Sequence, residues 1–331
     1  MMVLLNELFS LNPTLFFEVA RIEARVTNCV LPQQVFLVDV DKLNNLANLV
    51  SSYMNGLVDV EKLIHKINEI EFNVGEELKT NNLRKKLNEL DMEVLPFCTL
   101  IDRILSSKEI LVFPTVQYYV YDSSKERQIR KKLRRIRKLE MMILEKQDKL
   151  KNRMKIIKRE GELLGYPKCC INEFLKLKRK AVLFGSITPE KKVVMELLDL
   201  EILKTLPEIF NGLSFDLFYS LFSLNFYPCT IKCKRAVKIG KTCVDYLDQF
   251  GYRKAYECCL LFNAFYHLVT GYKSYLLLKD GKCKSKYSKK VVTHFSKLRP
   301  DIEEVLSAAK NVITDVKFGN EFIKNCVKVN L

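Results

Sequence analysis

Residues 166–170 read Tyr-Pro-Lys-Cys-Cys, and residues 227–233 read Tyr-Pro-Cys-Thr-Ile-Lys-Cys. In each phrase a proline stands just before cysteines, and helix-forming sequence follows. Proline is favoured at the first position of a helix, where its missing N–H group costs nothing. Both phrases therefore predict helix starts that carry thiols in the first turn. The partial positive charge of a helix N-terminus favours thiolate over thiol, so the two phrases together indicate one cysteine site.

We expect the ligands of this site to be Cys169, Cys170, Cys229 and Cys233. Cys229 and Cys233 are four residues apart, which on a helix places them on the same side. Cys169 and Cys170 are adjacent, about 100° apart around a helix, so both can face one ion only if the first turn is distorted. Thiolates favour zinc or an iron–sulfur cluster, and this spacing does not separate the two cofactors. Three thiolates with an open fourth position would instead favour reactivity.

Two other interpretations of these cysteines stay open. They can be small buried hydrophobic residues, which is common for cysteine. A disulfide can also join the two phrases, as in intracellular proteins of hyperthermophiles. The chain has eleven cysteines in 331 residues, and residues 1–20 lack the basic region of a secretory signal. The long apolar stretches at 209–231 and 258–272 are interrupted by polar residues, so we expect no membrane span and a cytoplasmic protein.

The formal net charge of +16 is concentrated in two segments of the chain. Residues 125–160 contain sixteen basic and five acidic residues, a net charge of +11. Residues 279–299 contain eight basic residues and one acidic residue, a net charge of +7. Concentrated positive charge indicates a polyanionic partner, RNA or DNA. A solvated helix face that only keeps the protein soluble has the same pattern.

Residues 125–164 have the longest helical pattern in the chain. Apolar residues recur at alternating steps of four and three, which predicts a long helix with a hairpin or coiled-coil seam and allows self-association. The outer positions of the first half are basic and have no aromatic residues between them, so they would contact phosphates rather than read bases. The nucleic-acid-binding residues that we predict are Arg130, Lys131, Lys132, Arg134, Arg135, Arg137 and Lys138.

The fold class that we predict is mainly α with a small α/β N-terminal part, which is α+β overall. Residues 35–40 form a short apolar run typical of a buried strand, and residues 110–121 favour a second strand that Pro114 breaks or places at an edge. No glycine-rich phosphate loop follows either run. The domains that we expect are a small mixed α/β domain, a long basic helix as connector and a mainly helical cysteine-containing domain, at residues 1–124, 125–164 and 165–331.

The two cysteine phrases resemble the paired signature of an uncharacterised prokaryotic family, mostly archaeal. Residues 164–174 read LGYPKCCINEF and residues 226–233 read FYPCTIKC, and members of that family share a GYPxCC phrase and a later PCxxxC phrase. The resemblance covers about residues 165–240. That family has no established activity, so the resemblance implies only which positions to test: Gly165, Tyr166, Pro167, Cys169, Cys170, Pro228, Cys229 and Cys233.

Three hypotheses of function follow from the sequence. The first is a cytoplasmic protein that binds zinc or an iron–sulfur cluster and contacts RNA or DNA through its basic helix. The second is a thiol- or metal-dependent enzyme, in which Glu173 is the nearest candidate base to the adjacent cysteines. The third is a helical scaffold for partner proteins.

Overall fold

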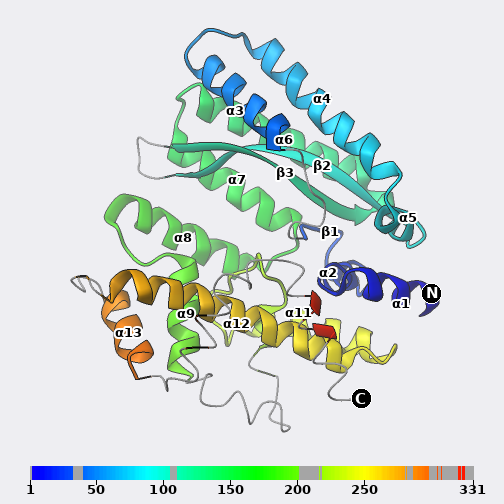
Figure 1. The fold of residues 1–331 in the computed structure, drawn as a ribbon, viewed down its shortest axis with the longest axis vertical. Coiled ribbons are helices and arrows are strands. Elements are labelled where there is room, and N and C mark those ends of the chain that lie inside the picture. The colour runs from blue at the N-terminus through cyan, green and yellow to red at the C-terminus, as the bar shows by residue number, and fades with distance from the viewer. Residues whose placement is uncertain are drawn as a thin grey trace. The chain divides into compact units, whose positions relative to one another are not determined.

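The computed structural model of the protein describes residues 2–32, 40–104, 110–200, 216, 218–279, 281 and 286–297, with a few further positions between 304 and 324. The chain forms two compact units: residues 1–166 with 182–184, and residues 167–181 with 185–331. The described part is mainly helical with one small antiparallel sheet (Figure 1), which confirms the predicted fold class. The strand expected at 35–40 lies outside the described residues except for Val40, where a helix begins.

The first unit contains the sheet and the basic segment. It begins with two short helices and a two-residue strand, α1 (Met2–Leu11), α2 (Pro13–Glu23) and β1 (Cys29–Val30). Three further helices, two long strands and a helical hairpin follow: α3 (Val40–Met54), α4 (Val60–Lys79), α5 (Asn82–Asn88), β2 (Met92–Ile104), β3 (Ile110–Asp122), η1 (Ser123–Lys125), α6 (Glu126–Leu144) and α7 (Lys149–Leu163).

The sheet has the strand order β1-β3-β2, and both pairings are antiparallel. The register between β2 and β3 shifts between Thr99 and Ile101, and Pro114 falls in this irregular part, where a missing N–H group does least harm. β2 itself contains Pro96, which fits its position at the edge of the described sheet. In Figure 1, α3 and α4 lie above the two long strands and α7 lies below them.

The basic segment forms a hairpin of two helices instead of one continuous helix. α6 and α7 pack against each other, and the connection between them includes Lys146 and Asp148, both with positive φ. The apolar side chains of α6 at Ile129, Leu133 and Ile136 are buried. The apolar side chains of α6 that the sequence predicted as a seam are therefore buried within the first unit.

Arg137 of α6 binds two carboxylates that lie along the outer edge of β2. Its guanidinium donates to Glu71 at 2.8 Å and to Glu140 at 2.7 Å. The same two carboxylates accept backbone N–H groups of β2, Glu71 from Cys98 at 2.8 Å and Glu140 from Leu100 at 3.0 Å. N–H groups that face away from the neighbouring strand are a site for unwanted pairing with another chain. Here two carboxylates satisfy them, and one arginine forms ion pairs with both carboxylates.

Burial raises the pKa of Glu160 on α7, and the guanidinium of Arg153 offsets part of this effect. The folded chain then holds the proton more tightly than the unfolded chain, so the free energy of unfolding falls as the pH rises from the ordinary carboxyl pKa to the raised one. We expect Glu160→Gln to reduce this slope and to stabilise the protein above that window. Thermal melts at a series of pH values measure the effect. Glu162→Gln, an exposed change on the same helix, is the control, and an equal slope in both variants would contradict the assignment.

The second unit is helical in the part that the structure describes. Its elements are α8 (Lys168–Phe184, whose last three residues group with the first unit), α9 (Pro189–Asp199), η3 (Tyr219–Leu221), α11 (Lys234–Asp248), α12 (Arg253–Leu278) and α13 (Lys286–Phe295). α12 packs against α9, α11 and α13, which explains why it is apolar around most of its circumference. Cys258, Cys259 and His267 belong to its buried residues.

None of the helices in the described ranges combines the length and the hydropathy that a membrane span requires.

Candidate metal centre

The first cysteine phrase begins where α7 ends. Gly165 has a φ of +72°, and a Cβ at this position would collide with Thr27. The backbone N–H of Tyr166 then donates to Gly161 O at 2.9 Å, which closes the C-terminus of α7. Both the left-handed conformation and the close approach of Thr27 require glycine at this position. The ring of Tyr166 lies against the guanidinium of Arg21, 5.6 Å from its carbon to the ring centroid.

The first turn of α8 brings two adjacent thiols together. Pro167 caps the helix, and Cys169 and Cys170 are its second and third residues. Pro167 O accepts from Cys170 N at 2.9 Å and from Ile171 N at 3.0 Å, a bifurcated arrangement that is common at helix ends. The sulfur atoms of Cys169 and Cys170 lie 3.9 Å apart. The two adjacent thiols thus lie close together, although the first turn keeps its α-helical bond from Ile171 N to Pro167 O.

The second phrase does not start a helix at Pro228, contrary to the sequence prediction. α11 begins at Lys234 with Cys233 as its N-cap, and the segment from Cys229 to Cys233 contains a turn closed by a 2.9 Å bond from Cys233 N to Thr230 O. Cys229 and Cys233 thus approach each other across a turn and not along one helix face. The backbone groups of this turn bond to side chains from other elements, which replaces the bonds that a helix would have supplied.

Three side chains hold the turn. Ser220 of η3 donates to Ile231 O at 2.7 Å, and Glu196 of α9 accepts from Ile231 N at 2.7 Å. The ammonium group of Lys192, one turn before Glu196 on α9, donates to Cys229 O. These contacts cannot be predicted from the sequence. A spacing of four puts Lys192 and Glu196 on one face of a helix, but the partner of that face depends on how α9 packs.

The four cysteines predicted as ligands lie together in the second unit. Cys233 is 3.8 Å from Cys169 and 3.7 Å from Cys170, measured between sulfur atoms. All four sulfur atoms, including that of Cys229, lie within 4.8 Å of one another. Cys170 and Cys233 are buried, with 1% and 7% of their surface exposed, whereas Cys169 and Cys229 are half-buried. Such a cluster could hold one metal ion.

The protein environment shifts the pKa values of the individual thiols in different directions. Burial raises the pKa of Cys170, and burial raises the pKa of Cys229 to about 11; Cys233 adds to the rise at both thiols. Burial also opposes ionisation of Cys233, but hydrogen bonds from the backbone N–H groups of Ala236 and Arg235 and from neighbouring thiols lower its pKa. The helix N-terminus thus favours thiolate at Cys233, the N-cap of α11, as expected for a thiol in that position.

The remaining residues considered from the sequence are a carboxylate, a histidine and the basic residues of α6. Glu173 of α8 forms ion pairs with Lys176 at 3.4 Å and Lys192 at 3.9 Å. His267 is buried with its ring 5.2 Å from that of Tyr227, and burial lowers the pKa of His267 to about 4, which keeps it neutral. Of the seven basic residues predicted on α6, two are half-buried, Lys132 and Arg137, and five are exposed: Arg130, Lys131, Arg134, Arg135 and Lys138.

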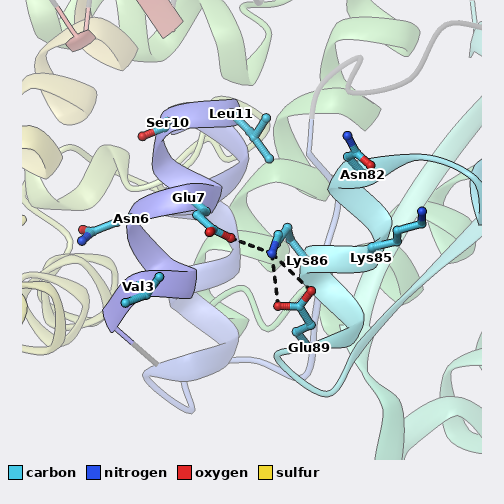
Figure 2. Close-up of a pocket in the computed structure, with 9 residues that line it drawn as sticks. All are labelled: Val3, Asn6, Glu7, Ser10, Leu11, Asn82, Lys85, Lys86 and Glu89. Atoms are coloured by element: carbon cyan, nitrogen blue, oxygen red, sulfur yellow. Dashed lines mark hydrogen bonds and ion pairs between the residues drawn. The ribbon is translucent and has the colours of Figure 1, made fainter.

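A separate groove of about 690 Å³ lies in the first unit between α1 and α5 (Figure 2). Lys86 lies at its centre and pairs with Glu7 at 2.6 Å and with Glu89 at 3.3 Å. The lining contains no cysteine or histidine. The charged groups in the groove neutralise one another, so it presents no arrangement for catalysis or metal binding.

The fold and the site define the protein as a mainly helical one with a four-cysteine cluster that could bind a metal. Residues 114–259 match a family described as "Protein of unknown function (DUF483)". The chain therefore contains a DUF483 domain, which confirms the expected relation to an uncharacterised family and includes both cysteine phrases. No curated protein and no solved structure matches the chain.

Proposed function

We propose that the DUF483 domain binds one zinc ion through Cys169, Cys170, Cys229 and Cys233. This proposal rests on the distances between the sulfur atoms. A tetrahedral zinc with Zn–S bonds of about 2.3 Å requires its sulfur atoms to lie about 3.8 Å apart. Three pairs in the cluster lie 3.7 to 3.9 Å apart. The sulfur atoms of Cys169, Cys170 and Cys233 thus have the spacing of three ligands of a tetrahedral site, and that of Cys229 lies within 4.8 Å of each of them.

The same separations weigh against the alternatives for these cysteines. A disulfide would place two sulfur atoms about 2.0 Å apart, much closer than any of the three measured pairs. An iron–sulfur cluster inserts several iron atoms and sulfides between the thiolates, which then lie farther apart than around one ion. Zinc is the ion most often held by four thiolates in a structural site.

The zinc has a structural role in this proposal. Four protein ligands leave no open position for substrate or water, so the site is closed. The carboxylate of Glu173, the candidate base of the enzyme hypothesis, is already paired with two lysines. The ion instead joins the start of α8 to the turn before α11, two segments about sixty residues apart in the sequence.

Zinc content and cobalt substitution test the proposal. We expect the purified protein to contain one zinc per chain, and Co²⁺ in its place to give the intense d–d and sulfur-to-cobalt bands of tetrahedral thiolate coordination. Cys243→Ala, which removes a buried cysteine of α11 outside the cluster, should leave both results unchanged. Octahedral cobalt bands, or the visible absorption of an iron–sulfur cluster in protein purified without oxygen, would overturn it.

A second function concerns the exposed face of α6. We propose that this face contacts the phosphates of RNA or DNA. Lys131, Arg134, Arg135 and Lys138 are exposed and have no ion pair in the described part of the chain, while the exposed Arg130 pairs with Glu126 at 2.7 Å. Arg137 is left out of the proposed surface because Glu71 and Glu140 already bind it.

Salt dependence tests the phosphate contacts. Each contact contributes a slope of about −0.9 to the dependence of log affinity on log salt for duplex DNA. We expect the combined change of Lys131, Arg134 and Lys138 to glutamine to weaken binding of a labelled duplex. The slope of log affinity against log salt should become less negative by about 2.7, the contribution of three phosphate contacts. The control changes three exposed lysines of α4 and α5, Lys62, Lys79 and Lys85. Equal binding by both triple variants would contradict the proposal.

A further inference from the structure

α9 carries no cysteine, yet it contacts both halves of the metal centre. Lys192 donates to Cys229 O, and its ammonium lies 3.9 Å from Glu173 on the helix that carries Cys169 and Cys170. Glu196 accepts from Ile231 N at 2.7 Å, in the middle of the turn between Cys229 and Cys233. Lys192 and Glu196 also pair with each other at 3.7 Å.

We propose that Lys192 and Glu196 are positioning residues that set the zinc affinity of the centre. This inference rests on the proposed zinc site. The turn at residues 229–232 has no helix to fix its shape, so the direction of the two cysteine side chains depends on what binds its backbone. Lys192 fixes the carbonyl at one end, and Glu196 fixes an N–H group in the middle.

Hydrogen bonds, and not a net positive charge, are what these side chains supply to the centre. Four thiolates and one Zn²⁺ have a net charge of −2, and hydrogen bonds and positive groups around such a centre lower its cost. Lys192, Glu173 and Glu196 together carry a charge of −1, so these groups fix the carbonyl of a ligand residue in place and do not neutralise the centre. All three side chains are about three-quarters buried, so solvent screens these interactions less than it screens a surface pair.

The chain offers a matched control for this pair. Lys178 of α8 and Glu190 of α9 form an ion pair at 2.6 Å with a similar degree of exposure. This pair also joins α8 to α9, but neither side chain has a hydrogen bond to residues 229–233 among the contacts described. Glu190→Ala therefore breaks a contact between the same two helices without releasing the cysteine turn.

Competition for Zn²⁺ against a chelator of known affinity tests the inference. Changes to groups just outside the ligands of a metal site lower affinity by about 10–100-fold. We expect a loss of this size for Glu196→Ala and Lys192→Met, with broadened and shifted Co²⁺ bands, and no loss for Glu190→Ala. Glu196→Gln should retain part of the affinity, because its amide oxygen can still accept from Ile231 N.

The outcomes separate this inference from the zinc proposal. If the unaltered protein binds one zinc with tetrahedral cobalt bands but Glu196→Ala and Glu190→Ala have equal affinity, the positioning role is wrong and the zinc site stands. If the unaltered protein binds no zinc, the zinc proposal fails first. Circular dichroism of each zinc-loaded variant shows whether a loss of affinity comes from unfolding, and a loss only in unfolded protein would also overturn the positioning role.

Discussion

Replacing Cys170 with serine is expected to release the zinc ion that we propose and to destabilise the second unit around α8 and α11. Cys170 is the most deeply buried of the four cysteines, with 1% of its surface exposed. Structural zinc contributes about 10–16 kcal/mol of apparent binding free energy in zinc-finger peptides at neutral pH, and that energy is coupled to folding. Without the ion, the short turn at residues 229–232 and the first turn of α8 lose the bond that joins them.

Hydrogen exchange followed by mass spectrometry measures this effect in the intact protein. Peptides that cover the start of α8 and the start of α11 should lose most of their protection in Cys170→Ser, and β2 and β3 of the first unit should keep theirs. Cys243→Ala is the matched control, since it removes a buried thiol from α11 and leaves the cluster intact. The structural role of the zinc is wrong if the two variants exchange alike, or if removing zinc with a chelator leaves protection at α8 and α11 unchanged.

Replacing Arg137 with methionine is expected to destabilise the first unit by about 3–5 kcal/mol, the usual cost of leaving a buried charge without its partner. Arg137 and Glu140 have 13% and 1% of their side chains exposed, so water cannot replace the lost pairing. Glu71 loses its partner in the same change. Methionine keeps much of the packing over Phe97, whose ring centroid is 4.3 Å from the guanidinium carbon, so the variant mainly removes charge.

Urea denaturation and hydrogen exchange of β2 check this prediction. The N–H groups of Cys98 and Leu100 should exchange faster because their carboxylate acceptors are no longer held in place. Arg135→Met changes an exposed arginine of the same helix and should have little effect on stability. A destabilisation by Arg137→Met no larger than that of Arg135→Met would show that the arginine is not needed at the sheet edge. Increased aggregation in Arg137→Met alone would support a role in closing that edge.

Local patterns in the sequence were enough to predict which four of the eleven cysteines lie together, because each of the two phrases places cysteines close to a proline. The helix predicted after Pro167 is present as α8. The helix predicted after Pro228 is not, since the backbone of residues 229–232 finds its partners in Ser220, Lys192 and Glu196. No local pattern distinguishes these two cases, because the competing hydrogen bonds come from residues that are distant in the sequence.

The strand β2 shows a similar limit. Its sequence contains Pro96 and charged residues, which weaken the strand pattern, and no strand was predicted there. The strand forms because it pairs with β3 along most of its length and because Glu71 and Glu140 satisfy N–H groups on its other side. Arg137 was grouped with the basic face of α6 for the same reason, since sequence spacing cannot show that two carboxylates lie beside it.

The sequence by itself determined that this protein is mainly helical, that its charge lies in two segments and that two phrases carry paired cysteines. These are properties of composition and of residues that are near one another along the chain. Only the tertiary structure decided that the sulfur atoms lie within 4.8 Å of one another, that α9 holds the second phrase and that Arg137 belongs to the sheet edge. Each of these depends on contacts between segments far apart in sequence, which form when the apolar faces of helices and strands pack and bring their polar groups together.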